Sequence, residues 1–303
     1  MRFNIGTRSS KLAMLQADFI SDALRQKGYQ TAVVIFDTIG DKNLGIPIAK
    51  IGGKGVFTEE LEIALKKGVI DLAVHSAKDL PTDIESQFEI IAFTKREASH
   101  DVLVSNKQIN INGNSIVIGT SSTRRTAFLK HFYPSHAVVD VRGNIQTRFK
   151  KMNSGKCDAL MLANAGISRM GLDRFIKHRF KTDLVVPPVG QGSLAIEVSS
   201  ALSNEKKNIL RKSLNHLFSE QLIIAERSFL KTLQGGCSIP AFGLAEWHEK
   251  KICIKGGIIS LDGKKMVKKE LFGYDSVELG AKLAEQVLNA GGSDILSEIK
   301  RTL

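Results

Sequence analysis

The feature that most constrains the fold is an alternation of strand-like and helix-like segments through the first two thirds of the chain. Residues 4–7 are expected to form a short strand, and residues 11–27 have the periodicity of an amphipathic helix that ends at Gly28. The expected segments that continue this order are strands at 31–38, 71–75, 101–104, 115–119, 138–141, 159–162 and 194–198, and a helix at 57–67. Because such alternation places helices against a largely parallel sheet, the sequence predicts α/β layers.

The pattern changes after Gly235-Gly236. Short strands separated by glycine turns are expected at 243–247, 251–258 and 266–272, and a helix is expected at 276–289. Strands that follow one another closely form antiparallel sheets, so this part of the chain predicts a small α+β domain.

The charge is concentrated in the middle of the chain. The 303 residues carry a net charge of +12, and residues 93–190 hold 16 basic and 6 acidic side chains, with eight of the 14 arginines. Arginine presents a planar fork that binds carboxylate or phosphate through two hydrogen bonds, so this concentration indicates an anionic partner. A solvated basic surface is the alternative explanation for the scattered lysines.

Composition excludes several classes of protein. With 43% hydrophobic and 24% charged residues and only six prolines, the chain is neither disordered, collagen-like nor a coiled coil. No apolar run approaches the ~20 residues that span a bilayer, and residues 1–6 lack a signal-peptide hydrophobic region, so we expect no membrane association. Cys157, Cys237 and Cys253 are odd in number and widely spaced, which favours a reduced cytoplasmic protein without a disulfide framework or a zinc site.

Two segments repeat one pattern. Residues 5–10 (Ile-Gly-Thr-Arg-Ser-Ser) and 118–125 (Ile-Gly-Thr-Ser-Ser-Thr-Arg-Arg) place hydroxyl side chains and arginine where a strand is followed by a helix. Free backbone N–H groups and the positive end of the helix dipole gather there and bind anions. Ordinary N-capping by Ser or Thr explains either segment alone. As a pair with arginines, the segments predict two α/β lobes that face a cleft at the carboxyl ends of their strands.

Asp79 is the candidate reactive carboxylate. The segment His75-Ser76-Ala77-Lys78-Asp79-Leu80-Pro81 follows the apolar run 71–74, and a carboxylate just beyond a strand of an open α/β sheet faces the ligand crevice. Asp79 can act there as a general acid or base, or as the counter-ion of a cationic intermediate. A turn or cap before Pro81 is the equally acceptable structural explanation.

Further candidates lie in loops and at strand ends. The segment Gly52-Gly53-Lys54-Gly55 lacks the spacing of a phosphate-binding P-loop, so we expect a loop that offers Lys50 and Lys54 to an anionic ligand. Five arginines near predicted strand ends are candidates to bind one multi-carboxylate ligand: Arg124, Arg125, Arg142, Arg148 and Arg169.

Cys237 lies in a tight loop, Gly235-Gly236-Cys237-Ser238-Ile239-Pro240. The two glycines allow another group to approach the sulfur, which favours exposure and covalent attachment, whereas a buried inert thiol is the usual fate of a lone cysteine.

Taken in order, these motifs resemble the hydroxymethylbilane synthase (porphobilinogen deaminase) family over essentially the whole chain. The resemblance implies three domains, two of them like the lobes of periplasmic binding proteins with mainly parallel mixed sheets, and a small α+β third domain. The implied bounds are 1–92 with 193–212, then 93–192, then 213–303. It also implies a transferase of porphyrin and haem biosynthesis that condenses four porphobilinogen molecules head to tail on a covalently bound dipyrromethane cofactor and releases ammonia.

The resemblance assigns roles to individual residues. Cys237 matches the cysteine that attaches the cofactor by a thioether, and Asp79 matches the catalytic aspartate. The residues that match positions binding the acetate and propionate groups of cofactor and substrate are Arg8, Ser10, Lys78, Ser122, Arg124, Arg125, Arg142, Arg148 and Arg169. Lys54, Gly55 and Phe57 match a loop that covers the cleft. The chain departs from the family pattern at Asn164 and at Ala241-Phe242-Gly243.

Two other functions compete with this interpretation. A non-enzymatic two-lobed anion-binding protein would need neither Cys237 in a glycine loop nor a third domain. A nucleic-acid binder would interleave basic residues with stacking aromatic residues, yet the chain has three Tyr and one Trp. We therefore expect a cytoplasmic monomer that binds porphobilinogen and needs no metal, nucleic acid or membrane.

Overall fold

The computed structural model describes residues 1–38, 58–236 and 239–302. Its contacts divide the chain into two compact units. The first unit consists of Met1–Glu97 and Gly192–Gln221, and the second consists of Ala98–Gln191 and Leu222–Leu303. The division into three domains stays a prediction.

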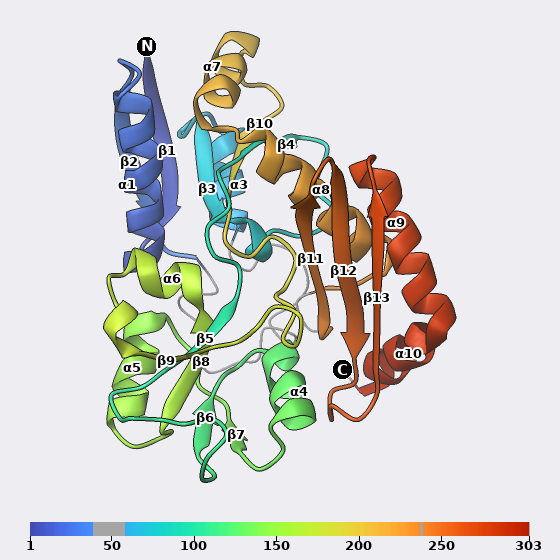
Figure 1. The fold of residues 1–303 in the computed structure, drawn as a ribbon. Helices are drawn as coiled ribbons and strands as arrows, with labels where there is room; N and C mark the ends of the chain where they lie inside the picture. The colour runs from blue at the N-terminus through green and yellow to red at the C-terminus, as the bar shows by residue number, and fades with distance from the viewer. Residues whose placement is uncertain (39–57, 237–238, 303) are drawn as a thin grey trace. The chain divides into compact units, whose positions relative to one another are not determined.

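The first unit is built on a five-stranded mixed sheet (Figure 1). In spatial order its strands are β2 (Gln30–Phe36), β1 (Arg2–Arg8), β3 (Leu72–Ser76), β10 (Leu194–Ser199) and β4 (Phe88–Phe93). Strands β1, β2 and β3 are parallel, and β10 runs antiparallel to both β3 and β4.

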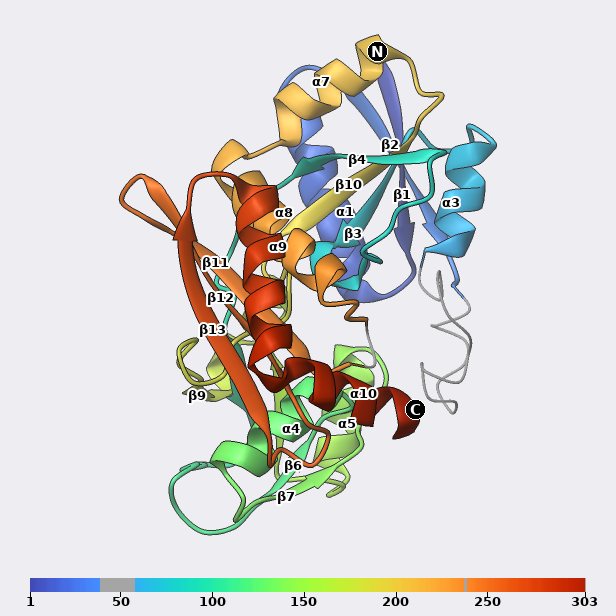
Figure 2. The same cartoon turned by 90° about the vertical axis from the view of Figure 1, so that its right-hand side faces the viewer.

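Helices cover both faces of this sheet. Helices α1 (Lys11–Arg25) and α7 (Asn204–Leu214) pack on the face that carries Leu72 and Val74. Helix α3 (Glu59–Lys66) packs on the other face, against Ala73 (Figure 2). Alternate residues of β3 therefore face opposite layers, which is why its pattern is a continuous apolar run.

The second unit contains a sheet with the same spatial pattern of strand directions. Its strands are β7 (Ala137–Val139), β6 (Val117–Gly119), β8 (Ala159–Ala163), β5 (Asp101–Val104) and β9 (Ile176–Arg179). Here β6, β7 and β8 are parallel, and β5 is antiparallel to β8 and β9. The helices that follow the parallel strands are α4 (Thr123–Phe132), α5 (Ile145–Asn153) and α6 (Asn164–Arg169). The two α/β sheets expected from the sequence are thus confirmed, but their connections differ: the fourth strand in space is the last along the chain in the first sheet (β10) and the first in the second (β5).

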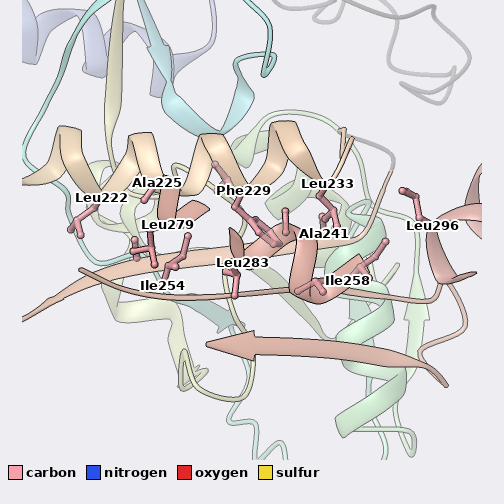
Figure 3. Close-up of a cluster of buried hydrophobic side chains, with 14 of the residues drawn as sticks. Leu222, Ala225, Phe229, Leu233, Ala241, Ile254, Ile258, Leu279, Leu283 and Leu296 are labelled. Carbon is pink, nitrogen blue, oxygen red and sulfur yellow. The ribbon is translucent and has the colours of Figure 1, made fainter. Parts of the chain in front are cut away.

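The same unit also holds the expected antiparallel sheet. Its strands are β11 (Ala241–His248), β12 (Lys251–Ile259) and β13 (Met266–Gly273), and helices α8 (Leu217–Thr232), α9 (Ser276–Val287) and α10 (Ser293–Thr302) accompany it. Ile254 and Ile258 pack with Phe229 and Leu283 between the sheet and its helices (Figure 3). Residues on the other face of the sheet pack toward α4. Phe242, which is opposite Gly257, contacts Phe128 there.

Two glycines inside β12 are required by this packing. A Cβ atom on Gly256 would lie 2.9 Å from Cζ of Phe229, and one on Gly257 would lie 2.6 Å from Cζ of Phe242. Both distances are shorter than ordinary van der Waals contact, so the phenylalanine rings occupy the space that side chains would need. The glycines therefore belong to the strand, where they let an aromatic ring approach from either side.

The predicted fold class is confirmed, with differences in detail. Strands β4 and β9 were not among the expected strands. Strands β5 and β10 are antiparallel to their neighbours, although their apolar patterns match those of the parallel strands. The expected helix 57–67 begins at Glu59 within the described residues, and residue 57 lies outside them.

One carboxyl group on α3 makes the stability of the first unit pH-dependent. Burial raises the pKa of Glu62, an effect that the nearby carboxylate of Glu197 reinforces, while Thr58 and His75 oppose it. A raised pKa means that folding favours the protonated form, so this contribution to stability is present below about pH 4 and is lost as the pH rises through the folded-state pKa.

We therefore predict that Glu62→Gln raises the unfolding temperature at pH 7 by about 1–2 °C, because the amide mimics the neutral acid. Thermal unfolding followed by circular dichroism at pH 4 and pH 7 checks this, and the difference should vanish at the lower pH. Glu59→Gln, on the exposed side of the same helix, should give no such increase. An equal increase in both variants would contradict the prediction.

Candidate functional site

Asp79 lies exposed at the carboxyl end of β3. The strand ends at Ser76, and Ala77–Asp79 form a single 3-10 turn in which Asp79 is exposed, whereas the next residue, Leu80, is buried. No other described residue forms a hydrogen bond or ion pair with Asp79, although the adjacent Lys78 is half-buried and does interact with a neighbour. An ionised carboxylate held on a short turn without a competing partner can interact with a ligand cation.

Contacts from two other elements hold this turn. The Ala77 amide donates to the Ser193 carbonyl oxygen at 3.0 Å, just beyond the register pair Leu194–Ser76. Nε2 of Gln16 on α1 donates to Oγ of Ser76 at 3.0 Å. Sequence reasoning did not find Gln16, because nothing but its place on the apolar face of α1 marks it as buried.

Arg8 and Ser10 lie at the same edge of the sheet as Asp79. Strands β1 and β3 are parallel neighbours with Ile5 opposite Leu72, so their carboxyl ends coincide. Arg8 ends β1, is half-buried and has an interaction partner. Ser10 is the N-cap of α1, and its Oγ accepts from the Ala13 amide at 3.3 Å. The structure thus brings three of the predicted first-unit residues to one sheet edge.

Arg124 and Arg125 are buried in the second unit on either side of one carboxylate. Nη2 of Arg124 donates to Oδ2 of Asp101 at 2.6 Å, and Nη2 of Arg125 donates to Oδ1 at 2.8 Å. Nε2 of Gln191 also donates to Oδ1 at 3.0 Å. Asp101 is completely buried, and the two arginines are 4% and 6% exposed. Burial would raise the pKa of the Asp101 carboxyl, but the two guanidinium groups outweigh it and hold that pKa well below its ordinary value.

This arrangement leaves donors and positive charge in excess. Carbonyl oxygens of Val186 and Met161 accept one further N–H from Arg124 and Arg125, at 2.8 and 3.1 Å. Nε of Arg125 is buried and has no hydrogen-bond partner among the described residues. Two guanidinium groups and one carboxylate sum to a net charge of +1, so the cluster keeps an excess positive charge that an acidic group would balance.

The remaining predicted cations follow the parallel strands of the same sheet. Arg142 comes shortly after β7, Ser122 is the N-cap of α4 after β6, and Arg169 ends α6 after β8. Arg148 lies on α5, with its Nε donating to the Gly143 carbonyl oxygen at 2.7 Å. The three arginines are half-buried, and each has an interaction partner. Because parallel neighbours end at one edge, these side chains share an edge with Ser122.

Five predicted residues lie outside the described part of the chain: Cys237, Lys50, Lys54, Gly55 and Phe57. The other two cysteines are buried. Burial raises the pKa of the Cys157 thiol. Burial, a hydrogen bond to Glu270 and the charge of that carboxylate raise the pKa of Cys253 to about 12. Neither thiol is therefore a ready nucleophile at neutral pH.

Within residues 1–38, 58–236 and 239–302, no group of three or more His, Cys, Asp or Glu side chains is placed to hold a metal ion. The helices of the same residues include none that is long and apolar enough to cross a membrane.

Comparisons with known proteins cover the whole chain. Residues 3–207 match the family model described as "Porphobilinogen deaminase, dipyromethane cofactor binding domain", and residues 221–289 match the one described as "Porphobilinogen deaminase, C-terminal domain". A porphobilinogen deaminase of Desulfosudis oleivorans is 50% identical over 99% of both chains. One of Cytophaga hutchinsonii is 49% identical over 99% of this chain and 97% of the relative.

A solved structure, the periplasmic VFT2 domain of BvgS from Bordetella pertussis, is 17% identical over 70% of this chain and 86% of that chain, with a TM-score of 0.41. The two family models and the two relatives name the same family. The chain therefore belongs to the porphobilinogen deaminase (hydroxymethylbilane synthase) family of transferases in tetrapyrrole synthesis.

Proposed function

We propose that this chain condenses four porphobilinogen molecules head to tail into hydroxymethylbilane, with Asp79 as its catalytic carboxylate and Cys237 as the attachment point of its dipyrromethane cofactor. The exposed Asp79 at the carboxyl end of β3, without a competing partner among the described residues, is the observation that carries the catalytic assignment. When bound, dipyrromethane supplies the pyrrole carbon to which the first substrate is joined.

Asp79 meets the electrostatic demand of the reaction. Loss of ammonia from porphobilinogen leaves a cationic substrate, and an ionised carboxylate beside it lowers the energy of that charge. In its protonated form the same group can assist the departing amine, and as a base it can accept the proton that the newly joined pyrrole must lose.

Basic and hydroxyl side chains bind the acidic side groups of the pyrroles. Every porphobilinogen unit carries two carboxylates, so each addition increases the negative charge that the protein must hold. We assign this role to Arg8, Ser10, Lys78, Ser122, Arg124, Arg125, Arg142, Arg148 and Arg169. The cluster around Asp101 supports the assignment because it has excess positive charge and a buried N–H of Arg125 that lacks a partner among the described residues. Lys50, Lys54, Gly55 and Phe57 remain the predicted covering loop.

The properties of the other two cysteines support Cys237 as the attachment point of the cofactor. Both Cys157 and Cys253 are buried with raised pKa values, so neither offers the thiolate that forms a thioether. The proposal also includes a monomeric, cytoplasmic enzyme without a nucleic-acid partner, in keeping with an odd number of widely spaced cysteines and few stacking aromatic residues. The family assignment disfavours the alternative of a non-enzymatic anion-binding protein.

The attachment point is tested by the intact mass of the purified protein. We expect an excess over the sequence mass equal to two linked pyrrole units, lost in Cys237→Ser and kept in Cys253→Ser. Protein without the excess is first incubated with porphobilinogen and measured again. An adduct on Cys237→Ser, or none on any protein, would contradict the assignment.

The catalytic carboxylate is tested by Asp79→Asn. The amide keeps the shape of the side chain but cannot balance a cation or accept a proton, so kcat should fall by about 100-fold or more. The intact mass should still show the bound cofactor. Asp18→Asn, an exposed aspartate on α1, serves as the control and should keep normal turnover. Near-normal turnover of Asp79→Asn would refute the role.

The acid-binding role is best tested at Arg142. Arg124→Leu or Arg125→Leu would also remove hydrogen bonds inside the buried cluster around Asp101, so their effects on ligand binding and on stability could not be separated. Arg142→Leu should reduce cofactor loading or raise KM for porphobilinogen by about tenfold, the loss of one charged hydrogen bond. Arg174→Leu removes an exposed arginine and should change neither. Equal behaviour of both variants would exclude the role for Arg142.

A further inference from the structure

A buried carboxylate and a buried imidazole lie next to the turn that carries Asp79, and the proposed function uses neither. Nε2 of His75 is 2.9 Å from Oε2 of Glu197. The two side chains are 4% and 0% exposed. His75 is the penultimate residue of β3, four positions before Asp79, and Glu197 lies on β10.

The register of the strands explains why these side chains meet. In the antiparallel pair β3–β10, Ala195 is opposite His75 and Glu197 is opposite Ala73. His75 and Glu197 are therefore diagonal neighbours on one face of the sheet. It is the face on which Ala73 packs against α3. Their hydrogen bond links the two strands immediately before the ladder ends at Leu194–Ser76.

Burying this pair costs desolvation free energy that an apolar pair would not cost. Oε2 of Glu197 is bonded to His75, but Oε1 is buried and has no hydrogen-bond partner among the described residues. The nearest other acids in electrostatic contact are Glu62 of α3, which interacts with both members of the pair, and Glu85, which interacts with Glu62. Apolar side chains of similar size often stabilise a fold as well as or better than a buried ionic pair. Stability of the sheet therefore gives no reason for these two residue types here.

The geometry points to a positioning role: we propose that the hydrogen bond between Glu197 and His75 fixes the end of β3 and thereby the orientation of the Ser76–Asp79 turn. A backbone hydrogen bond to Ser193 and a side-chain hydrogen bond from Gln16 also hold the turn, but both contacts involve residues that follow His75. The His75–Glu197 bond fixes the strand itself just before them. The inference rests on Asp79 being the catalytic carboxylate, and neither His75 nor Glu197 needs to touch substrate or cofactor.

The decisive variant replaces both partners by apolar side chains, His75→Leu with Glu197→Leu. This double variant should fold with an unfolding temperature equal to or above that of the native protein, since no buried charge is left. Its kcat should nevertheless fall by about tenfold or more, because a small misplacement of a catalytic group has a large effect on rate. KM and the cofactor mass should change little, because the acid-binding cations are untouched.

A conservative variant and a structural readout separate positioning from packing. In His75→Gln the amide N–H replaces the Nε2–H donor, so kcat should stay within about threefold of the native value. Hydrogen exchange provides a readout besides activity: the Ala77 amide, which donates to Ser193, should exchange faster in the double variant and normally in His75→Gln. Amides of α1 should be unchanged in both.

The outcomes distinguish this inference from the assignment of Asp79. Native kcat and native Ala77 exchange in a folded double variant would overturn the positioning role while leaving Asp79 unaffected. Normal turnover of Asp79→Asn would instead overturn the catalytic assignment, on which the inference depends. If the double variant does not fold, a second apolar pair, His75→Phe with Glu197→Met, decides: it also leaves neither partner buried alone, and a native kcat in it would overturn the inference.

Discussion

The ion pairs of Arg124 and Arg125 with Asp101 are the interaction on which the second unit depends. Two guanidinium groups in a low-dielectric interior repel each other strongly, and only a carboxylate placed between them makes their burial tolerable. Asp101 fixes both guanidinium groups. Through its hydrogen bond from Gln191 it also fixes the segment that leads from this unit to β10. The compensation is incomplete, because one carboxylate balances only one of the two charges. A residual positive charge held in a rigid frame is what the recognition of an acidic pyrrole chain requires.

Capping and anion binding, which the sequence presented as alternatives at Ser10 and Ser122, are compatible. Each hydroxyl oxygen accepts a hydrogen bond from the first turn of its helix, from Ala13 and from Arg125 respectively. A hydroxyl group that accepts through oxygen still has its proton to donate. The same serine can therefore begin a helix and offer a hydrogen bond to a carboxylate, and a sequence pattern cannot separate two roles that one side chain is able to combine.

The sequence predicted which segments form the layers better than it predicted the directions of the strands. Residues 101–104 and 194–198 were expected as strands, and they form β5 and β10, but an apolar run carries no mark of its direction. The exposed Asp79 and the capping serines were found because local spacing defines turns. Sequence patterns did not reveal Gln16, Asp101 or Glu197. The partner of Gln16 is 60 positions away, those of Asp101 are 23 and 24 positions away, and that of Glu197 is 122 positions away, so only the folded chain shows these contacts.

The position of β10 has a consequence for how the chain folds as it is synthesised. Strand β10 separates β3 from β4 in the first sheet, yet it belongs to residues 194–199. When the first 97 residues have emerged from the ribosome, β3 and β4 therefore lack the strand that joins them, and their edges stay unpaired. The sheet of β5 to β9 needs only residues 101–179 and can form first. Met1–Glu97, the larger part of the first unit, must therefore wait, exposed to premature strand pairing, until the second sheet has been made.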